Sequence, residues 1–455
     1  MSGRVAMPNS KITTVWWFHP AIALGIPALI VGGSAYFIPA EAYGHYWKTA
    51  KHFDFSMFRL TLLSILVFSL AASLAKMRRV PESIADNKEW SENIPWDRVR
   101  FVFSLSYFLC LVGYIAWAVA AARNGVSLSM VIGAFTARAG ASYELRENLV
   151  RIAGVTTMTQ FGIAVIALGI PLGRVRGWSS VRMRCIVVLV LALFRAVINS
   201  ERLALIELAV PLAISYFGVR FMDERRGARS RILLRVAPVL SGGVLFLIFS
   251  AFEYSRSWIG FYASHEDSFW RFAGIRLVGY YATALNNGAL VLKSIGEPLH
   301  SPIFTMGFAW KFPILNSLTF ALFPNVTMAS DTYTNILSRG ANPEFNNPSG
   351  LLLPFIDFGT GGALMYWLVC GAICGYLYGE FVSGKSAGIF LYPVLFTSLI
   401  EASRILYWSD GRFVPPILLL VTSVLFLFHV PLGRNVRRPT PQGLMHRVGD
   451  PVATQ

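Results

Sequence analysis

Charged residues are scarce in this chain, since only 14% of its 455 residues are Asp, Glu, Lys or Arg. A soluble protein carries about a quarter charged residues, so the composition excludes an ordinary soluble domain. Acidic residues are the scarcer sign, with 24 Asp and Glu against 40 Lys and Arg. The net charge of +16 does not indicate nucleic-acid binding, because most basic residues lie in short segments between apolar runs. Basic residues in such segments set membrane topology and meet anionic lipid headgroups.

Cysteine and histidine are also rare, with 4 Cys and 7 His. The cysteines fall inside apolar runs, which excludes an exported disulfide framework and a cysteine zinc site. His265 and His300 have no companion at the spacing of metal ligands, so we predict no metal site. The chain lacks a G-x-x-x-x-G-K-[ST] loop, an H-E-x-x-H pair and a D-x-D signature, and we expect no cofactor.

Long apolar runs are what the chain has instead, and 55% of its residues are hydrophobic. Their lengths predict an all-α polytopic membrane protein with about ten transmembrane helices. The first run is too long for a signal peptide and is interpreted as an uncleaved span. The predicted spans are 16–38, 56–75, 101–122, 152–172, 184–199, 202–219, 234–252, 359–380, 386–403 and 413–432.

Basic residues cluster in alternate connections, which places those connections and both termini in the cytoplasm. The four clusters are 76–100, 174–184, 220–235 and 434–447. The chain then divides into membrane helices, one long external loop, further membrane helices and a cytoplasmic tail. These four parts are 1–252, 253–358, 359–433 and 434–455.

A polar cluster interrupts the apolar hairpin 184–219, where Arg195 is followed by Asn199 to Arg202. Two passes need about 40 residues, so the tip of this hairpin is expected at the outer membrane surface. Ionisable groups at such a place are usually functional. Arg195 and Arg202 suit a phosphate ligand, because a guanidinium offers a planar fork of donors. Alternatively, Arg202 pairs with Glu201 or Glu207, or reaches lipid headgroups.

The external loop contains two apolar stretches and a polar one. Residues 268–294 predict an amphipathic helix on the membrane surface. Residues 302–323 favour a re-entrant or interfacial pair of short helices, since Lys311 and Pro313 interrupt them. The polar stretch up to Gly350 is typical of a loop whose amides bind sugar hydroxyls. The amides expected to bind glycan are Asn287, Asn346 and Asn347.

Three further candidate site residues, Arg276, Arg404 and Asp357, each have two possible roles. Arg276 binds either lipid phosphate or substrate, and Arg404 either pairs with Glu401 or faces the cavity. Asp357, in PFIDFGTGG at the predicted entrance to a span, either caps a helix or acts as a general base. The series Gly371, Gly375 and Gly379 predicts tight helix packing.

The chain resembles bacterial oligosaccharide repeat-unit polymerases of the Wzy type. The resemblance lies in the overall layout and in three stretches. These are Asn199-Ser200-Glu201-Arg202-Leu203, the amide-rich Asn342 to Ser349, and Asp357-Phe358-Gly359 with Gly361.

This resemblance implies a metal-independent membrane glycosyltransferase of the GT-C type, located in the bacterial inner membrane. Its substrates would be oligosaccharides linked to undecaprenyl diphosphate, joined by one inverting displacement. A carboxylate, Asp357 first and Glu201 second, would deprotonate the attacking hydroxyl. Membrane lipids, a chain-length regulator and a flippase are the implied partners. The residues expected to bind the diphosphate are Arg195, Arg202, Arg276 and Arg404.

Three other functions remain open. An O-antigen ligase has similar spans and a large external loop, although the loop here lacks a well-placed histidine. A flippase or exporter would carry functional charges along a central path, whereas the charges here concentrate at the predicted outer surface. A non-catalytic membrane scaffold is the third alternative.

Overall fold

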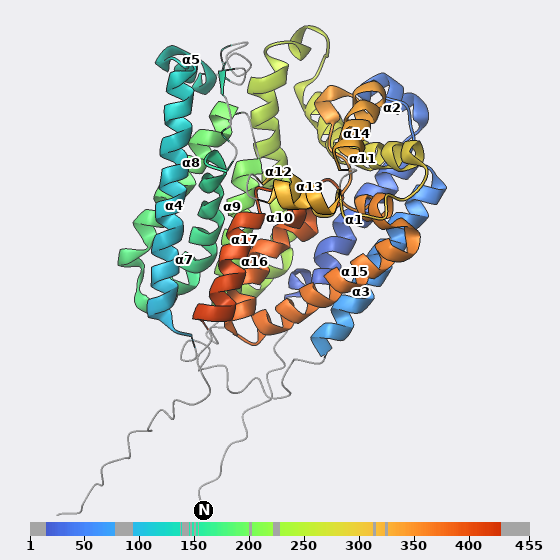
Figure 1. The fold of residues 1–455 in the computed structure, drawn as a ribbon. Coiled ribbons are helices and arrows are strands. Elements are labelled where there is room, and N and C mark those ends of the chain that lie inside the picture. The colour runs from blue at the N-terminus through green and yellow to red at the C-terminus, as the bar shows by residue number, and fades with distance from the viewer. Residues whose placement is uncertain are drawn as a thin grey trace, which may run out of the picture.

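The computed structural model describes residues 15–77, 94–136, 154–199, 203–221, 228–312, 315–323 and 326–428, with a few single residues between 138 and 152. All regular structure in these ranges is helical (Figure 1). The first half contains α1 (Pro20–Phe37), α2 (Ala40–Trp47), α3 (Phe55–Met77), α4 (Trp96–Arg123), α5 (Leu128–Phe135), α7 (Gly162–Arg176), α8 (Arg182–Asn199) and α9 (Leu203–Phe221). The second half contains α10 (Ala228–Glu253), α11 (Phe269–Ile295), α12 (Gly307–Lys311), α13 (Asn316–Leu322), α14 (Val326–Gly340), α15 (Leu353–Val382), α16 (Ser386–Glu401) and α17 (Val414–Thr422).

Six helices in the described ranges are long and apolar enough to cross a membrane. These are Pro20–Phe37, Phe55–Lys76, Trp96–Arg123, Thr156–Arg176, Leu234–Trp258 and Leu353–Val382. Three shorter apolar helices lie at Leu203–Val219, Ser386–Glu401 and Val414–Leu427. Every predicted span overlaps a helix, so the prediction of an α-helical membrane protein agrees with the fold.

One end of the bundle gathers basic residues at the ends of helices that are distant in sequence. Arg176 at the end of α7 pairs with Asp97 at the start of α4 at 3.1 Å. Arg98 on α4 donates to the carbonyl of Leu427, just after α17, at 2.9 Å. The helices α2, α5, α11 and α14 lie at the opposite end (Figure 1). We call the end that carries Arg98 and Arg176 the basic end; the long helix α11 and the shorter helices α2, α5 and α14 lie at the other end.

Close backbone contact holds α15 against α3. A Cβ atom added at Gly371 would overlap the carbonyl oxygen of Phe68, and one at Gly375 would overlap that of Ala72. The helices approach this closely only because both positions lack a side chain, as the glycine spacing predicted. Cys374, on the same helix, is buried and free.

Gly375→Ala is expected to destabilise the protein by about 1–3 kcal/mol, since the new methyl group must push α3 away. The measurement is thermal unfolding of the full-length protein in detergent. Gly361→Ala is the matched control on the same helix, because a Cβ there meets nothing within 4 Å. Equal unfolding temperatures for the two variants would contradict the close contact.

The helix α15 begins before the span predicted at 359–380, because a short turn precedes its long helical part. Gly359 has φ +67° and ψ −174°, in the left-handed region that favours glycine, so residues 353–358 form a separate turn before the long helix. Asp357 lies in that turn and is 0% exposed. Asp357, which was predicted at the entrance to a span, thus belongs to a buried helical turn, because α15 begins at Leu353 and packs inward from there.

The segment between α10 and α15 is more buried than its sequence suggested. The helix α11 forms as predicted, but its second half is enclosed by α1, α14 and α15, so it is not a surface helix along its length. The pair of short helices predicted for 302–323 is present as α12 and α13. The stretch predicted to be a loop after them begins instead with α14.

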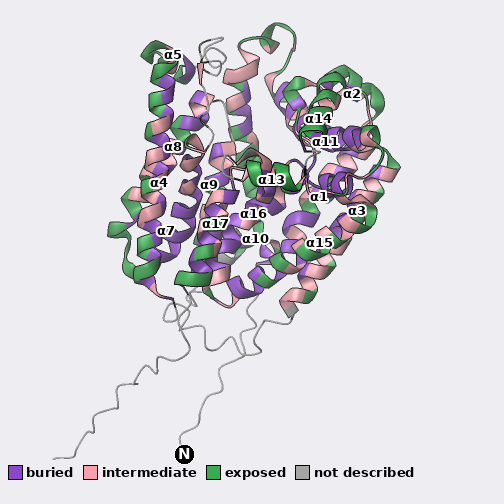
Figure 2. Ribbon diagram, viewed as in Figure 1, coloured by how far each residue is buried: buried purple, intermediate pink, exposed green. Residues whose placement is uncertain are grey.

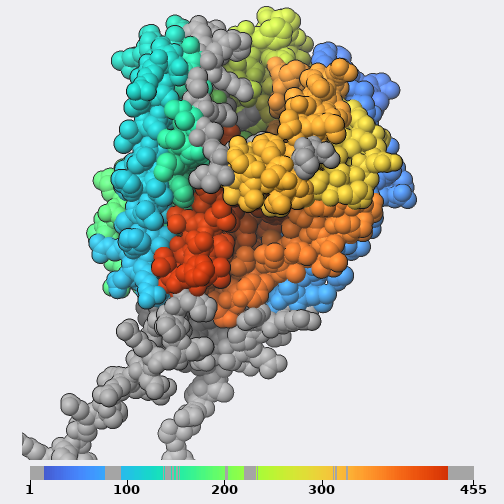
Figure 3. Space-filling model, viewed as in Figure 1, coloured from blue at the N-terminus to red at the C-terminus, as the bar shows by residue number. Residues whose placement is uncertain are grey.

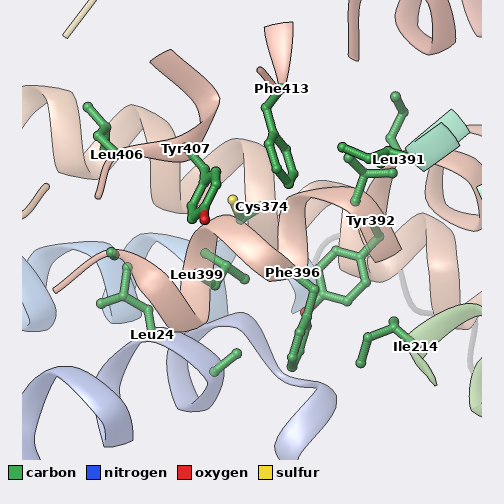
Figure 4. Packing of buried hydrophobic residues seen from close by; sticks show 14 of the residues in the cluster. Leu24, Ile214, Cys374, Leu391, Tyr392, Phe396, Leu399, Leu406, Tyr407 and Phe413 are labelled. Carbon is green, nitrogen blue, oxygen red and sulfur yellow. The ribbon is translucent and has the colours of Figure 1, made fainter. Parts of the chain in front are cut away.

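The core lies among the longer helices, and the helix faces turned outward are exposed (Figure 2). The ring centroids of Tyr392 and Phe396 on α16 lie 6.0 Å apart, and those of Tyr407 and Phe413 lie 4.7 Å apart (Figure 4). Tyr407 and Phe413 are 1% and 0% exposed. The contact between Tyr407 and Phe413 anchors both ends of residues 407–413, the last part of the connection from α16 to α17, which contributes to the cavity described next.

Candidate functional site

A cavity of about 900 Å³ lies between α8, α14 and the connection that precedes α17. Figure 3 shows the molecule hollowed beside α14 and α13. The polar side chains of its lining are Thr156, Thr157, Thr159, Gln160, Arg195, Asn199, Thr327, Ser330, Asp331, Asn347, Ser409, Asp410 and Arg412. The aromatic ones are Trp117, Phe161, Phe304, Phe308, Trp310, Phe312, Phe320 and Tyr333.

Arg195 on α8 lines this cavity and is 7% exposed. Its Nη1 donates to Thr159 Oγ1 at 2.6 Å. Thr159 belongs to the 3₁₀ helix Thr156–Phe161, which lies against α4 because Gly113 has no side chain to separate them. The Cys110 thiol adds a hydrogen bond to the Thr159 carbonyl at 3.4 Å. The small residues of α4 therefore set the position of the group that orients Arg195.

Arg412 is the second arginine of the cavity and comes from the connection before α17. Both arginines pair with Glu207 of α9, whose side chain is 1% exposed. Glu207 Oε2 lies 4.0 Å from Arg195 Nη2, and Oε1 lies 3.7 Å from Arg412 Nη1. The consecutive helices α8 and α9 and the connection before α17, which is distant from them in sequence, thus place two guanidinium groups around one buried carboxylate.

Two carboxylates also line the cavity. Asp410 is half-buried, and its Oδ1 accepts the backbone N–H of Arg412 at 2.9 Å. That hydrogen bond fixes the acid beside the arginine within one turn. Asp331 lies on the exposed side of α14. Burial raises the pKa of Tyr333, so its hydroxyl remains protonated at neutral pH and can donate a hydrogen bond.

This set of side chains fits a ligand with an anionic part and a polyhydroxyl part. Guanidinium groups bind phosphate oxygens strongly and keep their charge. Hydroxyls, amides and carboxylates accept and donate the hydrogen bonds that sugar hydroxyls need. The aromatic side chains supply the apolar area that encloses a ligand.

Asp357 does not line the cavity. Its Oδ1 accepts the backbone N–H of Phe304 at 3.0 Å, and its Oδ2 accepts the N–H and the hydroxyl of Thr305, each at 2.7 Å. It therefore fixes the segment that carries Phe304 and Gly307 into the cavity wall. This is a positional role, which differs both from a general base and from the predicted cap of its own helix.

Arg276 also lies away from the cavity lining. Its Nε is 2.6 Å from Glu253 Oε2 and its Nη1 is 2.6 Å from Glu344 Oε2. Burial acts to lower the pKa of this guanidinium, but attraction from the two carboxylates outweighs it, and the pKa is raised. The Phe345 ring lies 5.0 Å from its Cζ. These contacts hold α10, α11 and the Glu344 segment together, so Arg276 acts here as a structural residue.

Arg276→Ala is expected to destabilise the protein by about 3–5 kcal/mol, since Glu253 would remain buried without its cation. Thermal unfolding in detergent measures this, with Arg271→Ala as the exposed control on the same helix. A variant that unfolds like the wild type but binds substrate poorly would return Arg276 to the list of ligand-binding residues.

Arg404 pairs with Glu401 at 3.4 Å, which is one of the two predicted alternatives. Glu401 Oε1 also accepts the hydroxyl of Tyr281 at 2.9 Å. Arg404 is 9% exposed and is not part of the lining of the cavity. This pair joins the end of α16 to α11 and leaves the second alternative, a cavity-facing Arg404, without support.

The three asparagines predicted to bind glycan lie in three different environments. Asn347 lines the cavity, whereas Asn346 is exposed outside it. Asn287 is 0% exposed, and its amide donates to the carbonyls of Phe345 at 2.6 Å and of Asn347 at 3.1 Å. It therefore holds the segment that presents Asn347 instead of meeting the ligand.

Glu201 and Arg202 lie outside the described residues. Among the described ones, sequence reasoning overlooked Arg412 as a candidate, and it considered Glu207 only as a partner of Arg202. An acid inside the apolar stretch LALIELAV of α9 was a signal that could have identified Glu207. The described residues contain no group of three or more potential metal ligands of the His, Cys, Asp or Glu type.

Comparison of the chain with protein-family models, with curated proteins and with solved structures gave no match.

Proposed function

We propose that this protein is a membrane glycosyltransferase that polymerises undecaprenyl-diphosphate-linked oligosaccharide repeat units. The observation that carries the proposal is the cavity in which Arg195 and Arg412 lie with Asp410, Asn347 and an aromatic wall. Phosphate-binding and glycan-binding side chains occur there together. The Wzy-type resemblance of the sequence is compatible with this combination.

The proposed topology has about ten spans in a GT-C-like arrangement, with both termini in the cytoplasm of a bacterium. The basic end of the bundle supports this orientation under the positive-inside rule. Arg195 lies near the end of α8 that is remote from Arg182 and Arg184. The cavity then opens toward the periplasmic side, where lipid-linked rather than nucleotide-linked sugars are available.

The proposed reaction is a single displacement at the anomeric carbon. The acceptor hydroxyl oxygen forms the new bond to that carbon as the bond to the diphosphate oxygen breaks. Asp410 takes the hydroxyl proton, and Arg195 and Arg412 stabilise the negative charge that develops on the leaving undecaprenyl diphosphate. No external oxidant or nucleotide is consumed.

Purified full-length protein given lipid-linked repeat units tests this proposal. A ladder of products that differ by one repeat unit is the expected result. Products only after addition of a lipid A acceptor would instead identify a ligase. Movement of intact substrate across vesicle membranes without new glycosidic bonds would identify an exporter.

A further inference from the structure

Glu207 stands behind the two arginines of the cavity and contacts both. It is 1% exposed on α9, at 4.0 Å from Arg195 and 3.7 Å from Arg412. Charge-assisted hydrogen bonds between such groups are shorter, at about 2.7–2.9 Å. The carboxylate therefore neutralises part of the charge of the pair without a short, two-pronged contact to either guanidinium.

Gln160 forms hydrogen bonds with both Arg195 and Glu207 and so helps to position them. With its amide oriented to satisfy both neighbours, the carbonyl accepts from Arg195 at 2.9 Å and the NH₂ group donates to Glu207 at 3.0 Å. Gln160 is 6% exposed and also belongs to the cavity lining. The position of the carboxylate is thus fixed by more than its attraction to the arginines.

The other buried arginine pairs have a different geometry. Arg276 and Glu253 approach to 2.6 Å away from the cavity lining. Arg404 and Glu401 are also outside the lining and join two helices. Glu207 differs because Arg195 and Arg412, the arginines that it contacts among the described residues, both line the cavity.

We infer that Glu207 is a resident counter-anion that positions Arg195 and Arg412 and weakens their attraction for a bound diphosphate. Before substrate binds, it offsets the mutual repulsion of two partly buried cations. With a diphosphate bound, its negative charge repels the ligand, so that the leaving undecaprenyl diphosphate can depart. The inference rests on the proposed function for the identity of the anion as a diphosphate.

The test is the affinity of the purified full-length protein for inorganic pyrophosphate, measured by titration calorimetry in detergent. Glu207→Gln keeps the shape of the side chain but removes the negative charge that lies 4.0 Å from Arg195 and 3.7 Å from Arg412. Its dissociation constant for pyrophosphate is expected to be about tenfold lower than that of the wild type. In the transfer reaction, kcat and KM should fall together, because product release slows.

Glu401→Gln is the matched control, since it removes the charge of a buried, arginine-paired glutamate outside the cavity lining. Its pyrophosphate affinity should equal that of the wild type. Arg412→Ala should lose pyrophosphate binding. If Glu207→Gln does not fold, Glu207→Asp replaces it, because the shorter side chain withdraws the charge and should also tighten binding, by about threefold.

The outcomes separate the two proposals. Unchanged or weaker pyrophosphate binding in folded Glu207 variants overturns the counter-anion, even where the wild type builds a ladder of products. Tighter binding together with no glycan transfer by the wild type preserves the counter-anion and removes the proposed polymerase. A wild type that does not bind pyrophosphate overturns the anion site itself.

Discussion

Arg412→Ala is expected to reduce glycan transfer by about 10²–10³-fold while the protein remains folded. The reason is that Arg412 lines the cavity, carries a partly exposed guanidinium and lies beside Asp410. Its removal leaves Arg195 as the only described arginine in the lining to stabilise charge on the departing diphosphate. Glu207 would still have Arg195 as a partner, so the loss of stability should be modest. Single-turnover transfer with purified protein measures the effect.

Two comparisons sharpen this prediction. Arg412→Lys keeps the charge but loses the planar fork, so it should retain part of the activity. Arg339→Ala removes an exposed arginine of α14 that lies outside the cavity lining, and it should transfer like the wild type. If Arg412→Ala and Arg339→Ala have equal rates, the arginine pair does not take part in the reaction.

Asp410→Asn is expected to slow transfer by about 10²–10⁴-fold, the usual contribution of a general base. The asparagine can still accept the N–H of Arg412, which Asp410 accepts at 2.9 Å, so the connection before α17 should keep its shape. What is lost is the capacity to take a proton from the acceptor hydroxyl. Substrate binding should change little, so the effect should appear in kcat.

The controls are two other carboxylates, Asp331, which lines the cavity, and Asp357, which was predicted to be the general base. Asp331→Asn changes an exposed acid of α14 and should alter kcat only slightly. Asp357→Asn should lower the unfolding temperature, because its oxygens hold Phe304 and Thr305, while the folded fraction keeps its rate. A variant of Asp357 that folds normally but has no transfer activity would restore it as the base.

The helices were predictable from the sequence because hydropathy is a local property. Runs such as 56–75 and 101–122 contain enough apolar residues to form a span regardless of their neighbours. The break in α15 was also close to the predicted boundary, since Gly359 favours a backbone conformation that other residues avoid. Local chemistry was sufficient in both cases.

The composition of the site was less predictable because it depends on contacts between distant segments. Arg195 was identified from its place in an apolar hairpin, but nothing near Arg412 in the sequence indicates its pairing with Glu207. Asp357 and Asn287 illustrate the opposite difficulty. Their polar side chains suggested ligand contact, whereas both are buried: the Asp357 oxygens accept from backbone N–H groups and the Asn287 amide donates to backbone carbonyls. Polar residues in an apolar chain indicate importance without telling ligand contact from internal support.

The most direct test of the central claim is the place where the diphosphate binds. A lipid-linked repeat unit with a photoreactive group beside its diphosphate can be crosslinked to the full-length protein and mapped by mass spectrometry. We expect labelled residues in the lining around Phe161, Asn199 and Leu406, with labelling suppressed by inorganic pyrophosphate. Labelling confined to the exposed region around Trp270 and Arg271, unaffected by pyrophosphate, would contradict a diphosphate site in this cavity.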